Sequence, residues 1–162
     1  KDAIYTYRLN ATNPRAWIVH RVDALPDRDA IRSALAAPGF DSNQVAYTLT
    51  SISVEPSEAT DQVGESLIDP TQLTVDAELN SAGLLVTSEV NYPGWVATVN
   101  GVDSSVVEVD GLLRGVPLPG GHSHVEFVYR PMMLSIGVLM TCLGCLIGLG
   151  LFLVGNRGRR VA

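Results

Sequence analysis

The sequence predicts a mainly β, sandwich-like domain with one short helix, followed by a single C-terminal transmembrane α-helix. Many short segments alternate apolar and polar residues, and turn-forming residues separate them at near-regular spacing, as in all-β sandwiches. Residues 132–155 contain no charged side chain, and a helix of that length spans the ~30 Å hydrocarbon core of a bilayer. The predicted parts are a β domain over 1–130, a transmembrane helix over 131–156 and a basic tail over 157–162.

The first third of the chain predicts short strands around one helix. Residues 1–24 alternate weakly on both sides of a turn at 13–15, which predicts two strands. A helix is expected between Asp27 and Ala37, because Asp27 can accept hydrogen bonds from free backbone N–H groups and the apolar residues after it share one side. Pro38 and Gly39 end this helix. Alternation over 45–55 predicts another strand, whereas the polar stretch 56–70 is expected to be a loop.

The second half of the chain predicts a series of strands joined by tight turns. A period of two over 73–79 predicts a half-buried strand, and the apolar run 84–86 predicts a buried one. Further strands are expected at 95–99, 106–109, 112–118 and 124–129. Asn100-Gly101 is a strong hairpin signal, because both residues tolerate the positive φ of a type I′ turn. Asp110-Gly111 is predicted to form another turn.

Charge is distributed unevenly along the chain. All 17 acidic residues but only 8 of the 11 basic ones precede residue 132, which leaves the β domain with a net charge near −9. An acidic domain disfavours nucleic acid as a partner and disfavours lying flat on anionic lipid. The remaining basic residues, Arg157, Arg159 and Arg160, follow the apolar stretch. The positive-inside rule therefore places them in the cytoplasm and the β domain outside it.

An extracytoplasmic β domain needs a signal peptide or earlier membrane segments, and residues 1–30 show neither. We therefore expect a cleaved leader or a longer polypeptide. Cys142 and Cys145 are three apart in the predicted helix, where they cannot reach disulfide geometry, and are interpreted as small residues at a packing face.

No catalytic constellation is predicted. No serine stands in a nucleophile-elbow pattern, and no glycine-rich phosphate loop joins a strand to a helix. His122 and His124 alternate along a strand, but two ligands without a third make a weak metal site. With His20, they are expected at the surface or in turns. No catalytic residue, metal ion or cofactor is therefore expected.

Four residues of the β domain allow two interpretations each. Tyr92 and Trp95, separated by Pro-Gly, form either a platform for a sugar ring or a tight strand connection whose Trp fills the core. Arg15 and Arg114 either bind phosphate or carboxylate groups through the guanidinium fork or pair with nearby acidic residues. For the first pair we favour the strand connection whose Trp95 fills the core, and for the two arginines we favour pairing with acidic residues.

A line of small residues marks the predicted helix. Gly137, Thr141, Gly144 and Gly148 are spaced four, three and four apart, so they share one stripe of a helix. Small residues at this spacing allow two helix backbones to approach closely. A partner helix is therefore expected, from another subunit or from the same polypeptide.

Several segments resemble the C-terminal domain of YfhO-type bacterial membrane proteins. The most specific are Tyr92-Pro93-Gly94-Trp95 and Tyr129-Arg130-Pro131, and the others, in chain order, are 13–20, 37–41, 83–91, 99–101, 113–116, 118–122 and 125–128. The resemblance covers most of 13–140. It implies a polytopic glycosyltransferase that uses lipid-linked donors, with an extracytoplasmic β domain before its last helix. The catalytic acidic residues that it implies lie in an early loop that this sequence does not contain, so no residue here inherits that activity.

The sequence thus predicts a non-catalytic accessory or structural subunit of a larger membrane complex in the bacterial inner membrane. Its expected partners are membrane lipid and other transmembrane helices. Two alternatives stay open. The chain is the C-terminal domain of a polytopic lipid-linked-sugar glycosyltransferase, or it is a carbohydrate-binding module that contacts a glycan through Trp95 and neighbouring polar groups.

Overall fold

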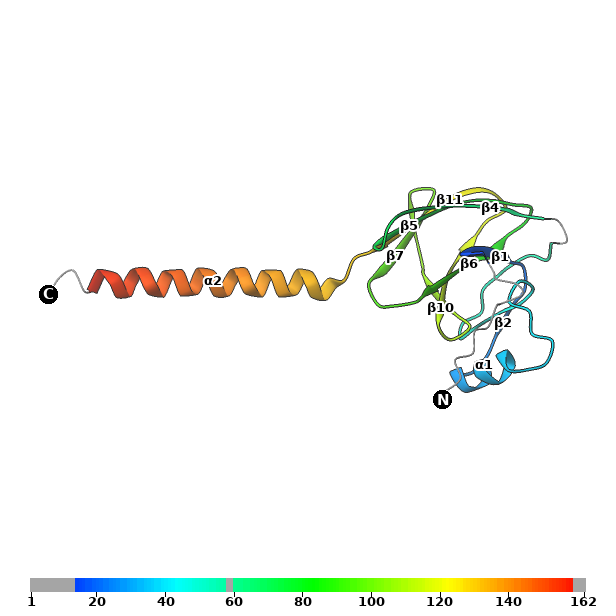
Figure 1. Cartoon of the computed structure of the whole chain (residues 1–162), viewed down its shortest axis with the longest axis horizontal. Coiled ribbons are helices and arrows are strands. Elements are labelled where there is room, and N and C mark those ends of the chain that lie inside the picture. The colour runs from blue at the N-terminus through cyan, green and yellow to red at the C-terminus, as the bar shows by residue number, and fades with distance from the viewer. Residues whose placement is uncertain (1–13, 58–59, 159–162) are drawn as a thin grey trace, which may run out of the picture. The chain divides into compact units, whose positions relative to one another are not determined.

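The computed structural model describes residues 14–57 and 60–158. The chain divides into two units, a β domain over Lys1–Tyr129 and a second unit over Arg130–Ala162 that contains a long helix (Figure 1).

Two antiparallel sheets form the β domain. The first has the order β1-β6-β10-β9, and its strands are Ala16–Val19, Gly83–Val90, Leu113–Leu118 and Val107–Val109. The second has the order β4-β5-β11-β7-β8, and its strands are Gln62–Asp69, Gln72–Leu79, Gly121–Tyr129, Trp95–Val99 and Val102–Ser104. Every strand pair within these two sheets is antiparallel.

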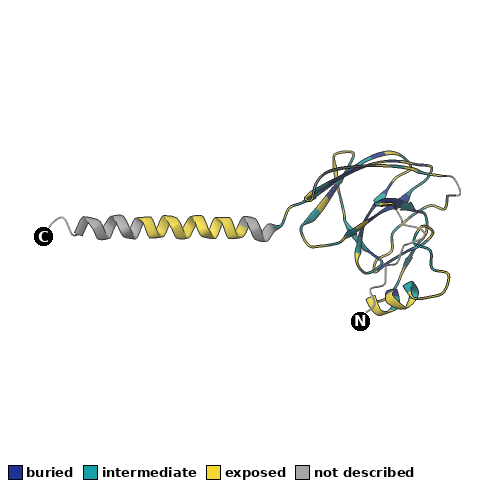
Figure 2. Cartoon of the chain, in the orientation of Figure 1, coloured by how far each residue is buried: buried dark blue, intermediate teal, exposed yellow. Residues whose placement is uncertain are grey.

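The main core lies between these two sheets. One cluster of buried side chains takes Leu85 and Val116 from the first sheet and Val75, Val125 and Phe127 from the second. Successive residues of a strand face opposite sides, so every second residue contributes to this core. The buried positions follow the strands of both sheets in Figure 2. The prediction of a mainly β, sandwich-like domain is therefore confirmed.

A third, smaller layer covers the outer face of the first sheet. It contains the parallel pair β2 (Val22–Ala24) and β3 (Ala46–Thr48) and the helix α1 (Arg28–Leu35). A second buried cluster lies there and contains Trp17, Val19, Ala46, Leu84, Val86 and Val109. The first sheet is thus covered by protein on both faces, which explains why Leu84, Leu85 and Val86 are all fully buried.

The predicted cap and turns are confirmed. The side chain of Asp27 accepts a hydrogen bond from the Ala30 backbone N–H at 2.8 Å and caps α1. Asn100 and Gly101 have φ values of 52° and 79°, as the predicted type I′ turn requires. Asp110 and Gly111 repeat this pattern with 54° and 72°.

Two predicted elements of the β domain are wrong. Residues 62–69 of the predicted loop form β4, which hydrogen-bonds only to β5 at the edge of its sheet. An edge strand tolerates polar residues, so its composition resembles that of a loop. The strand predicted over 45–55 is only Ala46–Thr48. Beyond it, Thr48 Oγ1 donates to Thr50 O at 2.8 Å, which turns the chain away. The strand predicted before residue 13 lies outside the described residues.

The predicted transmembrane helix is also corrected. The second unit contains α2 (Met132–Gly158), and its apolar side chains Leu139, Met140 and Leu146 are exposed. In the part of the chain that the structure describes, no helix has both the length and the apolar character needed to cross a membrane. The prediction of a transmembrane helix over 131–156 is therefore wrong.

Close packing of β10 gives a testable prediction. A Cβ atom at Gly115 would lie 2.7 Å from the Leu85 carbonyl oxygen and 2.9 Å from Val109 Cγ2. We expect Gly115→Ala to lower the free energy of unfolding by about 1–3 kcal/mol, because the backbone of β6 must move. Urea unfolding of the chain in detergent measures this loss.

The matched control is Gly64→Ala in β4, where a Cβ atom would meet only the Asp76 carbonyl oxygen at 3.8 Å. This variant should lose much less stability than Gly115→Ala. Equal losses in the two variants would contradict the packing argument.

Candidate functional site

A buried arginine lies inside the sandwich. Arg114 and Val116 are two residues apart on β10 and therefore share the face that points between the two sheets. The Arg114 side chain is 1% exposed there. Its guanidinium carbon is 3.6 Å from the centre of the Trp95 ring and 5.4 Å from that of Phe127. Among the described residues, no hydrogen-bond partner reaches its Nε or Nη1. Burial lowers the pKa of Arg114, and the negative charge of Glu89 partly offsets this effect.

Glu89 joins this arginine to a second one. Its Oε2 lies 3.6 Å from Nη2 of Arg114, and its Oε1 accepts a 2.8 Å hydrogen bond from Nε of Arg15. The Ser88 backbone N–H donates to the Arg15 carbonyl oxygen at 2.8 Å, which holds the two segments together. Arg15 and Glu89 are each about one-third exposed, so only Arg114 is fully removed from water.

Of the four residues for which the sequence allowed two interpretations, Arg15, Trp95 and Arg114 lie close together here. We call Arg15, Glu89, Trp95, Arg114, Phe127 and Tyr129 the arginine–aromatic cluster. The Trp95 ring packs against the main core and lies 5.4 Å from the Tyr129 ring. Arg114 covers a face of Trp95 that a sugar ring would otherwise use. Tyr92 is 63% exposed in the turn before β7.

A Ser–His–Asp arrangement that the sequence did not predict lies at the edge of the domain. His20 Nε2 is 2.7 Å from Asp61 Oδ2, and His20 Nδ1 is 3.4 Å from Ser81 Oγ. These residues are far apart in the sequence and belong to no motif, so only the fold brings them together. The three residue types are those of a catalytic triad, but the ring nitrogens are exchanged, because in a triad Nδ1 faces the aspartate and Nε2 faces the serine.

The hydrogen bonds of His20 do not suit nucleophilic catalysis. Nδ1 lies 2.9 Å from the Glu55 carbonyl oxygen and 3.3 Å from the Ala82 carbonyl oxygen. Because these carbonyl oxygens can only accept, Nδ1 serves as the donor toward them and is not available to take a proton from the Ser81 hydroxyl. The arrangement instead ties the segment around Glu55 and Asp61 to the sandwich.

The other predicted histidines lie on β11. His124 Nδ1 is 2.6 Å from Asp76 Oδ1 and its Nε2 is 3.6 Å from Glu126. The hydrogen bond to Asp76 is the main cause that raises the pKa of His124. His122 is exposed on the same strand. Within residues 14–57 and 60–158, no three His, Cys, Asp or Glu side chains are grouped so that they could hold a metal ion.

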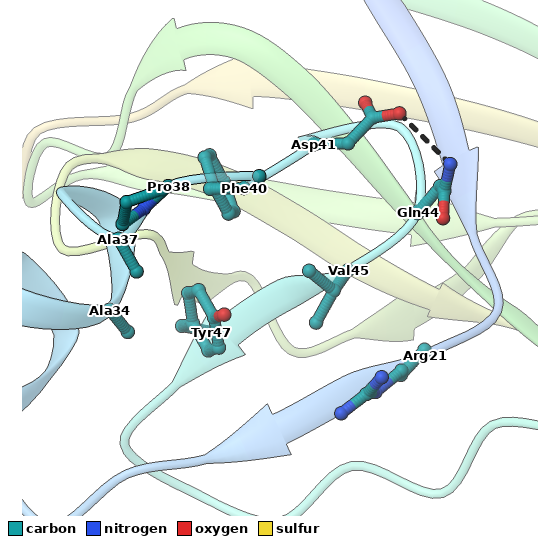
Figure 3. Close-up of a pocket in the computed structure, with 10 residues that line it drawn as sticks. Arg21, Ala34, Ala37, Pro38, Phe40, Asp41, Gln44, Val45 and Tyr47 are labelled. Atoms are coloured by element: carbon teal, nitrogen blue, oxygen red, sulfur yellow. Dashed lines mark hydrogen bonds between the residues drawn. The ribbon is translucent and has the colours of Figure 1, made fainter.

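A pocket of about 300 Å³ opens beside α1 (Figure 3). It is lined by Arg21, Ala34, Ala37, Pro38, Gly39, Phe40, Asp41, Gln44, Val45 and Tyr47. The rings of Phe40 and Tyr47 stack with centres 5.7 Å apart and planes 27° apart. Gly39 has φ of +86°, a value that favours glycine, and it lets the chain turn back after α1. The sequence analysis selected none of these residues for a site. All of them except Arg21 lie within residues 34–47, and only the fold brings Arg21 beside that stretch.

The walls of this pocket are held by hydrogen bonds. The Asp41 carboxylate accepts from the Asn43 backbone N–H at 2.9 Å and from Gln44 Nε2 at 3.1 Å. The Tyr47 N–H donates to Asp110 Oδ1, and the Asp110 N–H donates to the Tyr47 carbonyl oxygen, both at 2.8 Å. Burial raises the pKa of Asp110, and the hydrogen bond from Tyr47 acts in the opposite direction.

The four predicted helix-packing residues lie in the described part of α2. Thr141 Oγ1 donates to the Gly137 carbonyl oxygen at 2.9 Å. A Cβ atom added at Gly137, Gly144 or Gly148 would meet nothing within 4 Å. Of the tail residues predicted to set the topology, Arg157 is in the last turn of α2, whereas Arg159 and Arg160 lie outside the described residues.

Comparison with known proteins identifies the family. The family model described as "Bacterial membrane protein YfhO" matches residues 55–141, which is more than half of the chain. The match includes most strands of the sandwich and the first part of α2. Neither the curated proteins nor the solved structures contain a match. The resemblance seen in the sequence is thus confirmed, and the chain belongs to the YfhO family of bacterial membrane proteins.

Proposed function

We propose that this chain is a non-catalytic structural element of a larger bacterial membrane protein assembly, in which α2 packs against other helices. The observation that carries the proposal is the exposed apolar surface of α2. Eight large apolar side chains of this helix are between 46% and 68% exposed, namely Ile136, Val138, Leu139, Met140, Leu143, Leu146, Ile147 and Leu149. Burial of such surface is favourable by about 25 cal/mol per Å², so partners or lipid cover it in the assembly.

The line of small residues supports a helix as one of these partners. Gly137, Gly144 and Gly148 leave open space beside the helix backbone, so another backbone can approach closely. The Thr141 hydroxyl already donates to the Gly137 carbonyl oxygen, so burying it leaves no donor without an acceptor. Membrane lipid then covers the remaining apolar side chains.

The chemistry of the β domain supports a structural role. Arg15 and Arg114 contact Glu89, and both ring nitrogens of His20 contact oxygen acceptors. These polar groups hold strands and loops together. In this proposal they contribute to the stability of the domain, and any chemistry of the assembly is carried out elsewhere.

A second candidate function follows from the family. As the C-terminal domain of a polytopic lipid-linked-sugar glycosyltransferase, the chain would pack α2 against helices of its own polypeptide. Purification from native membranes with intact-mass measurement distinguishes the two. A mass near 17.3 kDa with stoichiometric foreign subunits supports the accessory subunit, and a much larger mass supports the transferase domain.

We also propose that the β domain lies outside the cytoplasm at the bacterial inner membrane. Its net charge near −9 supports this side, because the cytoplasmic leaflet is anionic and repels an acidic domain. The cytoplasmic location predicted for Arg157, Arg159 and Arg160 rested on a membrane-crossing helix, which the described part of the chain does not contain.

The packing of α2 is tested by Gly144→Leu. A leucine at this position holds a neighbouring backbone away, so we expect the yield of co-purifying subunits to fall about tenfold or more, equivalent to ~1.4 kcal/mol. Mild-detergent purification followed by quantitative mass spectrometry measures the yield. If α2 packs within a longer polypeptide instead, the same substitution should lower the thermal stability of that polypeptide.

The matched control is Met140→Leu, which exchanges two large apolar residues of the same helix. It should leave the yield unchanged, and urea unfolding of the β domain should be the same in both variants. Full retention of partners and unchanged thermal stability in Gly144→Leu would contradict the proposed helix packing.

A further inference from the structure

We propose that the pocket beside α1 binds a neutral saccharide of one or two rings. This inference concerns the β domain alone and does not depend on the packing of α2. The pocket measures about 300 Å³, the lower end of the range of ~300–1,000 Å³ for small-molecule sites.

One part of the pocket is apolar. Phe40 and Tyr47 present a stacked pair of rings, and Figure 3 shows Ala37 and Val45 on either side of Tyr47. The ring of a hexose has a face made of C–H groups, which packs on aromatic side chains. Aromatic rings also suit a ligand that is apolar on one side and polar on the other.

The polar part of the lining offers both donors and acceptors. Arg21 supplies N–H donors, the Asp41 carboxylate supplies acceptors, and the Gln44 amide supplies both. Among the described residues, no hydrogen bond occupies the Tyr47 hydroxyl or the Gln44 side-chain oxygen. Sugar hydroxyls both donate and accept, so they match a mixed lining of this kind.

The charges of the lining favour a neutral ligand. Arg21 and Asp41 contribute one positive and one negative charge. Arg21 already donates to Asp23 Oδ2 at 2.9 Å, so a phosphate or carboxylate would compete with Asp23. The same anion would be repelled by the Asp41 carboxylate.

The pocket is held in place before any ligand binds. Asp110 fixes the backbone of Tyr47 from both sides, and the hydrogen bonds to Asp41 fix the loop that carries Phe40. The Ala46 N–H donates to the Arg21 carbonyl oxygen at 3.0 Å, which joins the Arg21 wall to β3. Little conformational entropy is therefore lost on binding, and preorganisation of this kind raises affinity.

Saturation-transfer NMR tests the proposal with the full chain in lauryldimethylamine oxide, because a detergent with a sugar headgroup would compete. The probes are maltose and the methyl glycosides of glucose, galactose, mannose and N-acetylglucosamine. We expect saturation of the C–H protons of at least one probe. Trp17 gives a second readout, because its indole N–H donates to the Ser42 carbonyl oxygen in the pocket loop at 2.8 Å.

Variants locate the binding. Gln44→Ala changes an exposed residue and should weaken binding of the best probe about tenfold or more, with unchanged urea unfolding. Phe40→Ala should also weaken binding of the best probe, because it removes one ring of the stacked pair. Arg32→Ala, a 78% exposed arginine outside the lining, is the matched control and should bind like the wild type.

Three outcomes would overturn the proposal. The first is that no sugar probe shows saturation transfer from the protein. The second is that the wild type and Gln44→Ala bind the best probe with equal affinity. The third is that glucose 6-phosphate binds more tightly than the neutral sugars. None of them bears on the packing of α2, which the co-purification experiment tests separately.

Discussion

Replacing Trp95 by alanine is expected to lower the free energy of unfolding by about 3–5 kcal/mol, the range for removing a large aromatic side chain from a packed site. The Trp95 ring packs against the main core, lies beside Tyr129 and has the guanidinium of Arg114 on its face. Its loss leaves a cavity and removes the cation–π contact of a buried charge. Urea unfolding in detergent measures the change, with the fluorescence of Trp17 as the reporter.

Tyr92→Ala is the matched control, because Tyr92 is an aromatic residue of the same segment that is 63% exposed. It should change the free energy of unfolding by less than about 0.5 kcal/mol. If Trp95→Ala keeps the wild-type stability and loses glycan binding, the ring is a binding platform and the structural interpretation is wrong.

Replacing Glu89 by alanine is expected to cost about 3 kcal/mol, because it leaves Arg114 buried and charged without its carboxylate. Arg114 is 1% exposed, and in the described part of the chain Glu89 is the only acidic residue paired with it. Arg15 also loses its partner, but it is one-third exposed and gains water. Urea unfolding again gives the value.

Two further variants serve as controls for Glu89→Ala. Glu108→Ala breaks the surface pair with Arg28, whose side chain is 65% exposed, and should cost less than about 1 kcal/mol. Glu89→Ala combined with Arg114→Met should cost less than Glu89→Ala alone, because the buried charge is gone and the thioether still packs on the rings. A loss in Glu89→Ala no larger than in Glu108→Ala would contradict the argument.

Much of the β domain was predictable because its signals are local. A turn such as Asn100-Gly101 depends on the φ values that two neighbouring residues tolerate, and a cap such as Asp27 depends on a side chain three residues from its partner. The strand at 73–79 was predictable because burial of one sheet face imposes a period of two.

Other parts were not predictable because they depend on contacts between distant segments. The polar strand β4 exists because β5 offers it a partner, and its own composition resembles that of a loop. A buried strand was predictable from the apolar run of Leu84, Leu85 and Val86. Only the fold explains why all three side chains are buried, because the first sheet has one core on each face. The prediction for α2 failed in a different way, since composition alone was used to infer a membrane crossing.

The sequence by itself determined the mainly β character of the first unit, two of its turns, the helix cap and the family, because each rests on neighbouring residues or on ordered segments. Only the tertiary structure decided which side chains meet. It joined Arg15 and Arg114 through Glu89, placed Trp95 under a guanidinium, and gathered Arg21, Phe40 and Tyr47 around one pocket. The physical reason is that strand order and register set these contacts, and both depend on the packing of the whole domain.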